Sequence, residues 1–190
     1  MEYIDVINQL TKRLSQKRLQ HSIGVSQTAE SLAERFGCDT EKAKLAGIFH
    51  DLAREFPKKE LLPRAQAFGI VVNDIEQAEP VLLHAPLAAK MVQSEFGIDD
   101  VEILQAIRFH TVAGVDMTKL DKIIYVSDTI EPNRTFRGVD ELREMAQHDL
   151  DAVMLAVLEQ SICYIVKAGG LLHPATVAAR NQMLLQKMAY

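Results

Sequence analysis

The helical spacing of apolar residues constrains the fold of this 190-residue chain more than any other feature. Capping residues, glycine and proline interrupt this spacing at short intervals. A helix from about Ser15 or Leu19 to Phe36 carries His21 and Leu32 on one apolar stripe and stops before a glycine. The one strand-like run, "GIVVND", is short and isolated. The pattern therefore predicts an all-α class and a helical bundle.

The same signals predict the later helices. One is expected to begin with Thr40 as its N-cap and to end near Glu55, because Pro57 cannot continue the hydrogen bonding. Three more are expected near residues 139–147, 150–167 and 174–188. With 190 residues, a single domain over 1–190 is the simplest organisation.

Composition excludes several classes of partner. A net charge of -5 gives no reason to expect a nucleic-acid-binding surface. The most apolar stretch is interrupted by Glu159 and Lys167, which argues against a membrane span. The N-terminus lacks the positive charge of a signal peptide, and the two cysteines, Cys38 and Cys163, then favour reduced thiols. We therefore expect a cytoplasmic protein.

The segment "LAGIFHDLARE" places His50 and Asp51 side by side in an apolar run. Burial of such groups costs several kcal/mol unless a partner or a metal compensates. A second pair, His148 and Asp149, lies in a polar stretch where Asp149 can simply cap the following helix. Only the first pair therefore predicts a functional site.

Other elements supply partners for that pair. His21 lies on an apolar stripe, His84 opens a helix, His110 ends the apolar run "ILQAIRFH", and Asp128 comes late in "KIIYVSD". Imidazole nitrogens and carboxylate oxygens are suitable ligands for iron, manganese or zinc. Together these residues predict a metal centre.

The order His21, His50-Asp51, Asp128 resembles the H…HD…D signature of the HD-domain superfamily of metal-dependent phosphohydrolases, over residues 18 to about 134. His84 and His110 match the extra histidines of members that can hold two metals. The segments "LQHSIGV", "AGIFHDLARE", "LLHAPLAA", "AIRFHTVAG", "DTIEPNR" and "AGGLLHPATVAARN" look like those of the YqeK-type bacterial symmetrical bis(5'-nucleosyl)-tetraphosphatases.

The resemblance implies an HD core at about 18–134, with C-terminal helices at about 139–188 completing the bundle and a nucleotide pocket. It also implies that a metal-bound hydroxide cleaves diadenosine tetraphosphate symmetrically into two ADP. One or two iron ions are expected, with manganese or zinc as alternatives. The implied metal ligands are His21, His50, Asp51 and Asp128, whereas His84 and His110 either bind a second metal or act on the substrate.

Substrate-binding residues are expected around this centre. Arg54 lies four residues after His50, so on one continuous helix both would share a face. The glycines of "GGLLHPAT" permit close backbone approach, and the helix start that follows suits a phosphate. The remaining candidates are Thr111, Arg134, Gly170, Leu171, Leu172, His173, Pro174, Ala175 and Thr176.

Three other functions stay open at this point. The chain could be an HD-type phosphatase or pyrophosphatase acting on mononucleotides, a non-catalytic metal-containing nucleotide sensor, or an HD-fold oxygenase with two irons. Its expected small-molecule partner is a dinucleoside polyphosphate or an ADP- or GDP-like nucleotide. A homodimer, the base preference and the number of metal ions are left open.

Overall fold

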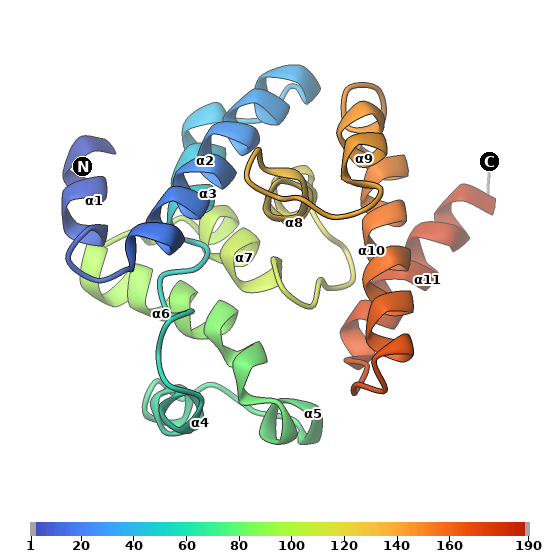
Figure 1. Cartoon of the computed structure of the whole chain (residues 1–190). Helices are drawn as coiled ribbons and strands as arrows, with labels where there is room; N and C mark the ends of the chain where they lie inside the picture. The colour runs from blue at the N-terminus through green and yellow to red at the C-terminus, as the bar shows by residue number, and fades with distance from the viewer. Residues whose placement is uncertain (1–2, 189–190) are drawn as a thin grey trace.

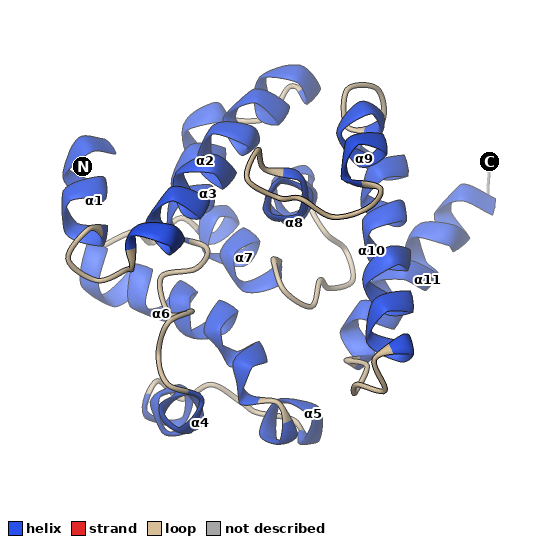
Figure 2. Cartoon of the chain, viewed as in Figure 1, coloured by secondary structure: helices blue, strands red, loops and turns tan. Residues whose placement is uncertain are grey.

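The computed structural model describes residues 3–188, and that range holds helices and no strand (Figure 2). This confirms the expected all-α class. The elements are α1 (Tyr3–Leu10), α2 (Gln16–Phe36), α3 (Thr40–Phe49), α4 (Lys58–Ala67), α5 (Asp74–Ala78), the short 3-10 helix η1 (Pro80–Leu83), α6 (His84–Phe96), α7 (Val101–Phe109), α8 (Lys119–Ile130), α9 (Val139–Met145), α10 (Leu150–Lys167) and α11 (Pro174–Met188).

Side-chain caps fix several helix starts. Ser15 accepts the backbone N–H of Arg18 at the start of α2, and Asp149 caps α10 as its polar setting indicated. The expected N-cap of α3 was wrong by one residue. Asp39 accepts the N–H of Lys42 and caps this helix, because its carboxylate reaches the free amides of the first turn.

The helix expected to continue to Glu55 ends six residues earlier, at Phe49. After His50 the backbone tightens, with Leu52 N–H bonded to the Phe49 carbonyl and Arg54 N–H bonded to that of Asp51. These are bonds to the third preceding residue, which turn the chain more sharply than an α-helix does. His50 and Asp51 therefore lie where a helix ends and a turn begins.

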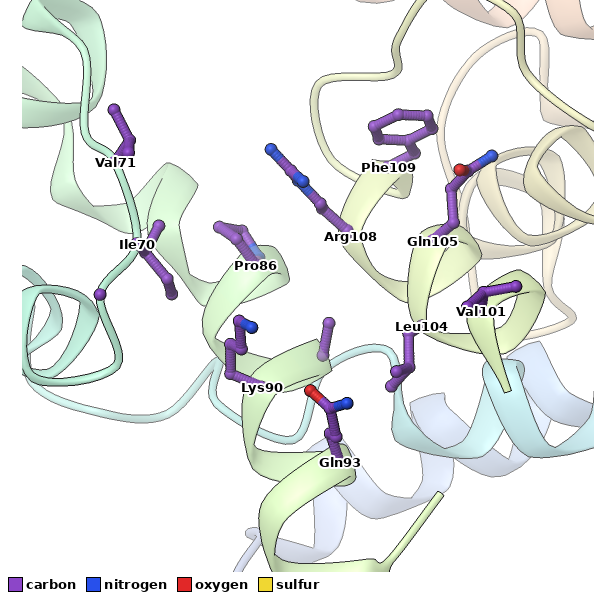
Figure 3. A pocket seen from close by; sticks show the side chains of 12 residues that line it. Ile70, Val71, Pro86, Lys90, Gln93, Val101, Leu104, Gln105, Arg108 and Phe109 are labelled. Atoms are coloured by element: carbon purple, nitrogen blue, oxygen red, sulfur yellow. The ribbon is translucent and has the colours of Figure 1, made fainter. Parts of the chain in front are cut away.

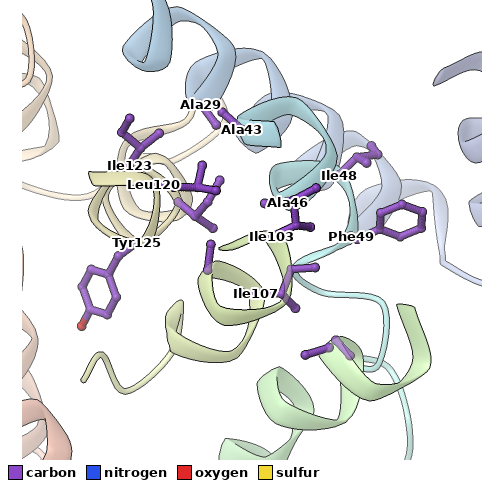
Figure 4. Close-up of a cluster of buried hydrophobic side chains, with 14 of the residues drawn as sticks. Ala29, Ala43, Ala46, Ile48, Phe49, Ile103, Ile107, Leu120, Ile123 and Tyr125 are labelled. Carbon is purple, nitrogen blue, oxygen red and sulfur yellow. The ribbon is translucent and has the colours of Figure 1, made fainter. Parts of the chain in front are cut away.

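The apolar core lies where α2, α3, α7 and α8 meet (Figure 4). Small residues such as Ala29 and Ala43 let α2 and α3 approach closely, and Ile107 and Ile123 from α7 and α8 fill the space beside them. Gly47 marks the closest approach, because a Cβ there would stand 2.7 Å from the Cα of Ser26. The contact between α2 and α3 thus requires glycine at this position.

Outer helices flank this core. α8 lies between the α2–α3 pair on one side and α10 with α11 on the other, while α4 and α5 lie below the start of α6 (Figure 1). Among residues 3–188, no helix combines the length and the apolar character needed to cross a membrane. The packing brings the ends of α3, η1 and α7 close to side chains from α2 and α8.

Candidate metal centre

Four of the residues predicted to bind metal converge from three parts of the fold. We call His21, His50, Asp51 and Asp128 the first cluster. His21 Nε2 lies 3.2 Å from His50 Nε2 and 3.0 Å from Asp128 Oδ1. His50 Nε2 lies 3.4 Å from Asp51 Oδ2. Helices α2 and α8 and the end of α3 thus bring four donor atoms to one point.

The two extra histidines form a second cluster with the same aspartate. Asp51 Oδ1 lies 3.3 Å from His84 Nε2 and 3.6 Å from His110 Nε2, and the two ring nitrogens lie 3.1 Å apart. Thr111 Oγ1 lies 3.1 Å from each of these nitrogens. Asp51 therefore serves both clusters, with Oδ2 toward the first and Oδ1 toward the second.

Three of the histidines are held in the same way, each directly after a helix end. His50 follows α3, His84 follows η1 and His110 follows α7, and the Nδ1 of each pairs with the carbonyl three residues earlier. The acceptors are the carbonyl oxygens of Gly47, Val81 and Ile107, at 2.7, 2.5 and 2.7 Å. These bonds need the hydrogen on Nδ1, so each Nε2 turns a lone pair toward the centre.

His21 is oriented by a carboxylate that the sequence pattern did not indicate. Its Nδ1 lies 3.1 Å from Oε1 of Glu131, which is 1% exposed. The other oxygen of Glu131 accepts the backbone and side-chain N–H groups of Asn133. A Cβ at position 24 would stand 2.5 Å from Oε2, so Gly24 makes room for this carboxylate. The available signal was an acidic residue one turn after Asp128.

The donor set fits a metal ion. In the second cluster both Nε2 atoms are acceptors, and the single hydroxyl hydrogen of Thr111 can satisfy only one of them. A cation would satisfy both lone pairs. The donor atoms within each cluster lie 3.0–3.8 Å apart, a range that includes the separations of about 3.0 to 3.4 Å between neighbouring ligands with bonds of about 2.1 Å.

The charges of these groups agree with ligand roles. Burial opposes ionisation of Asp51, but the surrounding imidazoles hold the pKa of its carboxyl well below the usual range. Burial likewise opposes ionisation of Asp128, whose pKa is lowered by the hydrogen bond from His21. Burial lowers the pKa of His84 and so favours the neutral ring that can bind metal. Burial also opposes protonation of His21, but Asp128 raises the pKa of that ring.

Three arginines lie near the centre or were expected there, and for one of them the expected helical geometry was wrong. Arg54 does not share a helical face with His50, because α3 ends at Phe49, and within residues 3–188 its side chain has no hydrogen-bond or ion-pair partner. Arg134 donates to Asp128 Oδ1 at 2.5 Å and to the Asp128 carbonyl at 2.8 Å. Arg18, which the sequence pattern did not indicate, donates to Asp51 Oδ2 at 2.5 Å. Its position three residues before His21 was the available signal.

The segment 170–176 is anchored next to the second cluster. Thr176 donates to the carbonyl of Val112 at 2.9 Å, and Val112 directly follows Thr111. His173 is buried and its Nε2 lies 3.0 Å from the side-chain nitrogen of Asn73. Among the hydrogen bonds and ion pairs of the described residues, none joins this segment to a predicted metal ligand. Gly170 to Leu172 form the turn that leads from α10 to α11.

A separate cavity of 430 Å³ lies between α6, α7 and residues 69–71 (Figure 3). Arg108 and Phe109 from α7 and Lys90 from α6 line it, and none of the predicted metal ligands does. His84 instead turns back toward η1 through its bond to the carbonyl of Val81. The cavity is thus distinct from the two clusters.

Comparisons with known proteins agree with this geometry. The chain matches the family model of the HD domain over residues 18–133. It is 42% identical to "Bis(5'-nucleosyl)-tetraphosphatase, symmetrical" of Halalkalibacterium halodurans, over 94% of this chain and 96% of that one. The protein of the same name from Bacillus subtilis is 40% identical, over 91% and 92%.

A solved structure is similar over nearly the whole chain. It is described as a "predicted HD superfamily hydrolase involved in NAD metabolism" from Clostridium acetobutylicum. The TM-score is 0.95 with 38% sequence identity, and the match covers 98% of each chain.

Proposed function

This chain belongs to the HD domain family, and on that premise we propose that it is a metal-dependent hydrolase that cleaves diadenosine tetraphosphate symmetrically into two ADP. Relatives bearing that activity in their names are similar over more than nine tenths of this chain. The observation that carries the proposal is the convergence of His21, His50, Asp51 and Asp128, with the ring hydrogens fixed so that lone pairs face one point.

In the proposed mechanism, the first cluster would hold one metal ion, while the second oxygen of Asp51 faces the His84–His110 pair. When bound, the metal polarises phosphoryl oxygens and makes water a competent nucleophile near neutral pH. Arg134 neutralises charge that develops on the phosphates, since its guanidinium already lies at the ligand carboxylate of Asp128. Thr111 orients a phosphate oxygen beside the second cluster.

Iron is the metal we propose, with manganese or zinc as alternatives. The clusters offer only imidazole nitrogen and carboxylate oxygen, which suit all three ions. Two donor clusters that share Asp51 favour two ions over one.

A cytoplasmic location agrees with the unpaired state of Cys38 and Cys163, and a homodimer stays a prediction.

The test is anaerobic reconstitution of the metal-free protein with iron, manganese or zinc, followed by incubation with diadenosine tetraphosphate and chromatography of the products. ADP as the sole product supports the proposal, whereas AMP together with ATP contradicts symmetrical cleavage. Binding without turnover under every metal would favour a nucleotide sensor. Turnover that needs oxygen would favour an oxygenase.

Two variants make this assay specific for the site. Asp51→Ala is expected to abolish turnover because it removes the carboxylate common to both clusters. His148→Ala is the matched control, since His148 belongs to the other His-Asp pair and is exposed, with Glu144 as its partner. Equal losses in the two variants would show that the wrong pair has been chosen.

A further inference from the structure

We propose that Arg18 binds the phosphates of the nucleotide substrate at the metal centre, a role that rests on the proposed function. Arg18 lies in the first turn of α2, three residues before His21 and on the same side of the helix. Its Nη1 donates to Asp51 Oδ2 at 2.5 Å. This places a guanidinium at the oxygen that faces the first cluster.

The start of α2 is fastened to the turn that carries Asp51. The backbone N–H and the hydroxyl of Ser15 both donate to the carboxylate of Glu55, at 2.6 Å each. Ser15 also caps α2 by accepting the N–H of Arg18. The base of the Arg18 side chain is therefore fixed relative to Asp51, and its guanidinium is directed to the centre before any ligand arrives.

The guanidinium has spare hydrogen-bonding capacity. An arginine offers five N–H donors, and Arg18 uses its Nη1 on Asp51, whereas Nε is buried and has no partner among residues 3–188. A buried donor without an acceptor is costly, so this guanidinium retains hydrogen-bonding capacity that Asp51 does not use. Its side chain is 27% exposed, against 5% for Asp51, so its outer part can be reached from solvent.

The net charge of the metal centre favours binding of an anion by the Arg18 guanidinium. Asp51, Asp128 and Glu131 carry three negative charges, and Arg18 and Arg134 carry two positive ones. The metal-free centre is thus negative by one charge, and one divalent ion makes it positive. With such an ion present, each guanidinium would share its carboxylate with a cation, and phosphate oxygens match the planar donor geometry of a guanidinium.

The experiment measures binding of ADP, AMP and adenosine by calorimetry to the metal-free and the manganese-loaded protein. Arg18→Ala is expected to weaken ADP binding to both forms at least tenfold while changing adenosine binding less than twofold. Arg18→Lys, which keeps the charge but loses the planar donors, should recover part of the loss. Arg35→Ala is the control, because Arg35 is exposed and, within the part of the chain that the structure describes, its side chain bonds only to the carbonyl of Gln147.

Several outcomes would overturn the proposal. Unchanged ADP affinity in Arg18→Ala, together with weaker manganese binding, would show that Arg18 only orients Asp51. Equal losses for ADP and adenosine would show a general disturbance of the pocket. Absence of ADP binding to the unmodified protein would also refute it. Loss of ADP affinity in a protein that does not cleave diadenosine tetraphosphate would instead retain the role of Arg18 and refute the proposed activity.

Discussion

Replacing Glu131 by glutamine tests whether the group behind His21 controls metal affinity. Glu131 accepts three hydrogen bonds, one from His21 on Oε1 and two from Asn133 on Oε2. Glutamine keeps the volume but offers only one acceptor oxygen, so it must lose either the bond to the imidazole or both bonds to Asn133. The first choice releases the imidazole of His21 from its hydrogen bond, and the second places the amide nitrogen against the N–H donors of Asn133 and so disturbs the side chain that orients His21.

The expected loss can be stated as a range. Groups that hydrogen-bond to metal-binding histidines typically change metal affinity tenfold to hundredfold, or about 1.4 to 2.7 kcal/mol. The loss should stand toward the upper end, because Glu131 is 1% exposed and water cannot replace the missing acceptor. The carboxylate also contributes negative charge next to the first cluster, and that contribution disappears in the variant.

The assay is a titration of the metal-free protein with manganese in the absence of oxygen, in competition with a chelator. Glu144→Gln is the matched control, since Glu144 is exposed and its side chain pairs with His148 alone among the described residues. A dissociation constant of Glu131→Gln within twofold of the unmodified protein, with the helical content retained, would refute the role given to Glu131.

Two further changes test the packing and the ionisation of buried groups. Gly47→Ala should destabilise the fold by about 1–3 kcal/mol, because its Cβ would stand 2.7 Å from the Cα of Ser26. Chemical unfolding would measure the loss. An unchanged unfolding midpoint would contradict the close approach of α2 and α3. Burial raises the pKa of Asp121, so the folded chain holds this proton more tightly and loses stability as pH rises from the ordinary carboxyl pKa of 3.8 through the raised value. Asp121→Asn should therefore gain stability over the unmodified protein as pH rises from about 4 to 7, and a difference that is constant with pH would contradict this.

The residues that converge in the two clusters could be predicted from the sequence because each is unusual in its own neighbourhood, and their roles as metal ligands stay a prediction. His50 and Asp51 follow an apolar run, and His110 ends another. The burial of these three side chains could therefore be inferred from the sequence without knowledge of the fold. The sequence also predicted the bounds of two C-terminal helices, since α10 and α11 begin and end at the expected residues. These are properties of short segments, which local physical chemistry determines.

The groups that hydrogen-bond to the predicted metal ligands depend on contacts between distant segments of the chain. Glu131 meets His21 across 110 positions of the chain, and Arg18 meets Asp51 across 33. The only local signal for each is its spacing from a cluster residue, three positions after Asp128 for Glu131 and three before His21 for Arg18, and that spacing alone does not indicate the contact. The expected shared helical face of Arg54 and His50 was wrong for a related reason, since it assumed a continuous helix where the bond from His50 to the Gly47 carbonyl accompanies a turn. Substrate binding by Arg54 stays a prediction.

The sharing of Asp51 between two clusters has a thermodynamic consequence. Oδ2 faces the first cluster and Oδ1 the second, so an ion on either side would change the charge and the orientation of the carboxylate that the other side needs. Whatever factor one ion applies to the affinity of the other, reciprocity requires the same factor in the opposite direction. Occupancy of the two sides is thus linked, and the affinity measured for a single ion would depend on how much of the other is already bound.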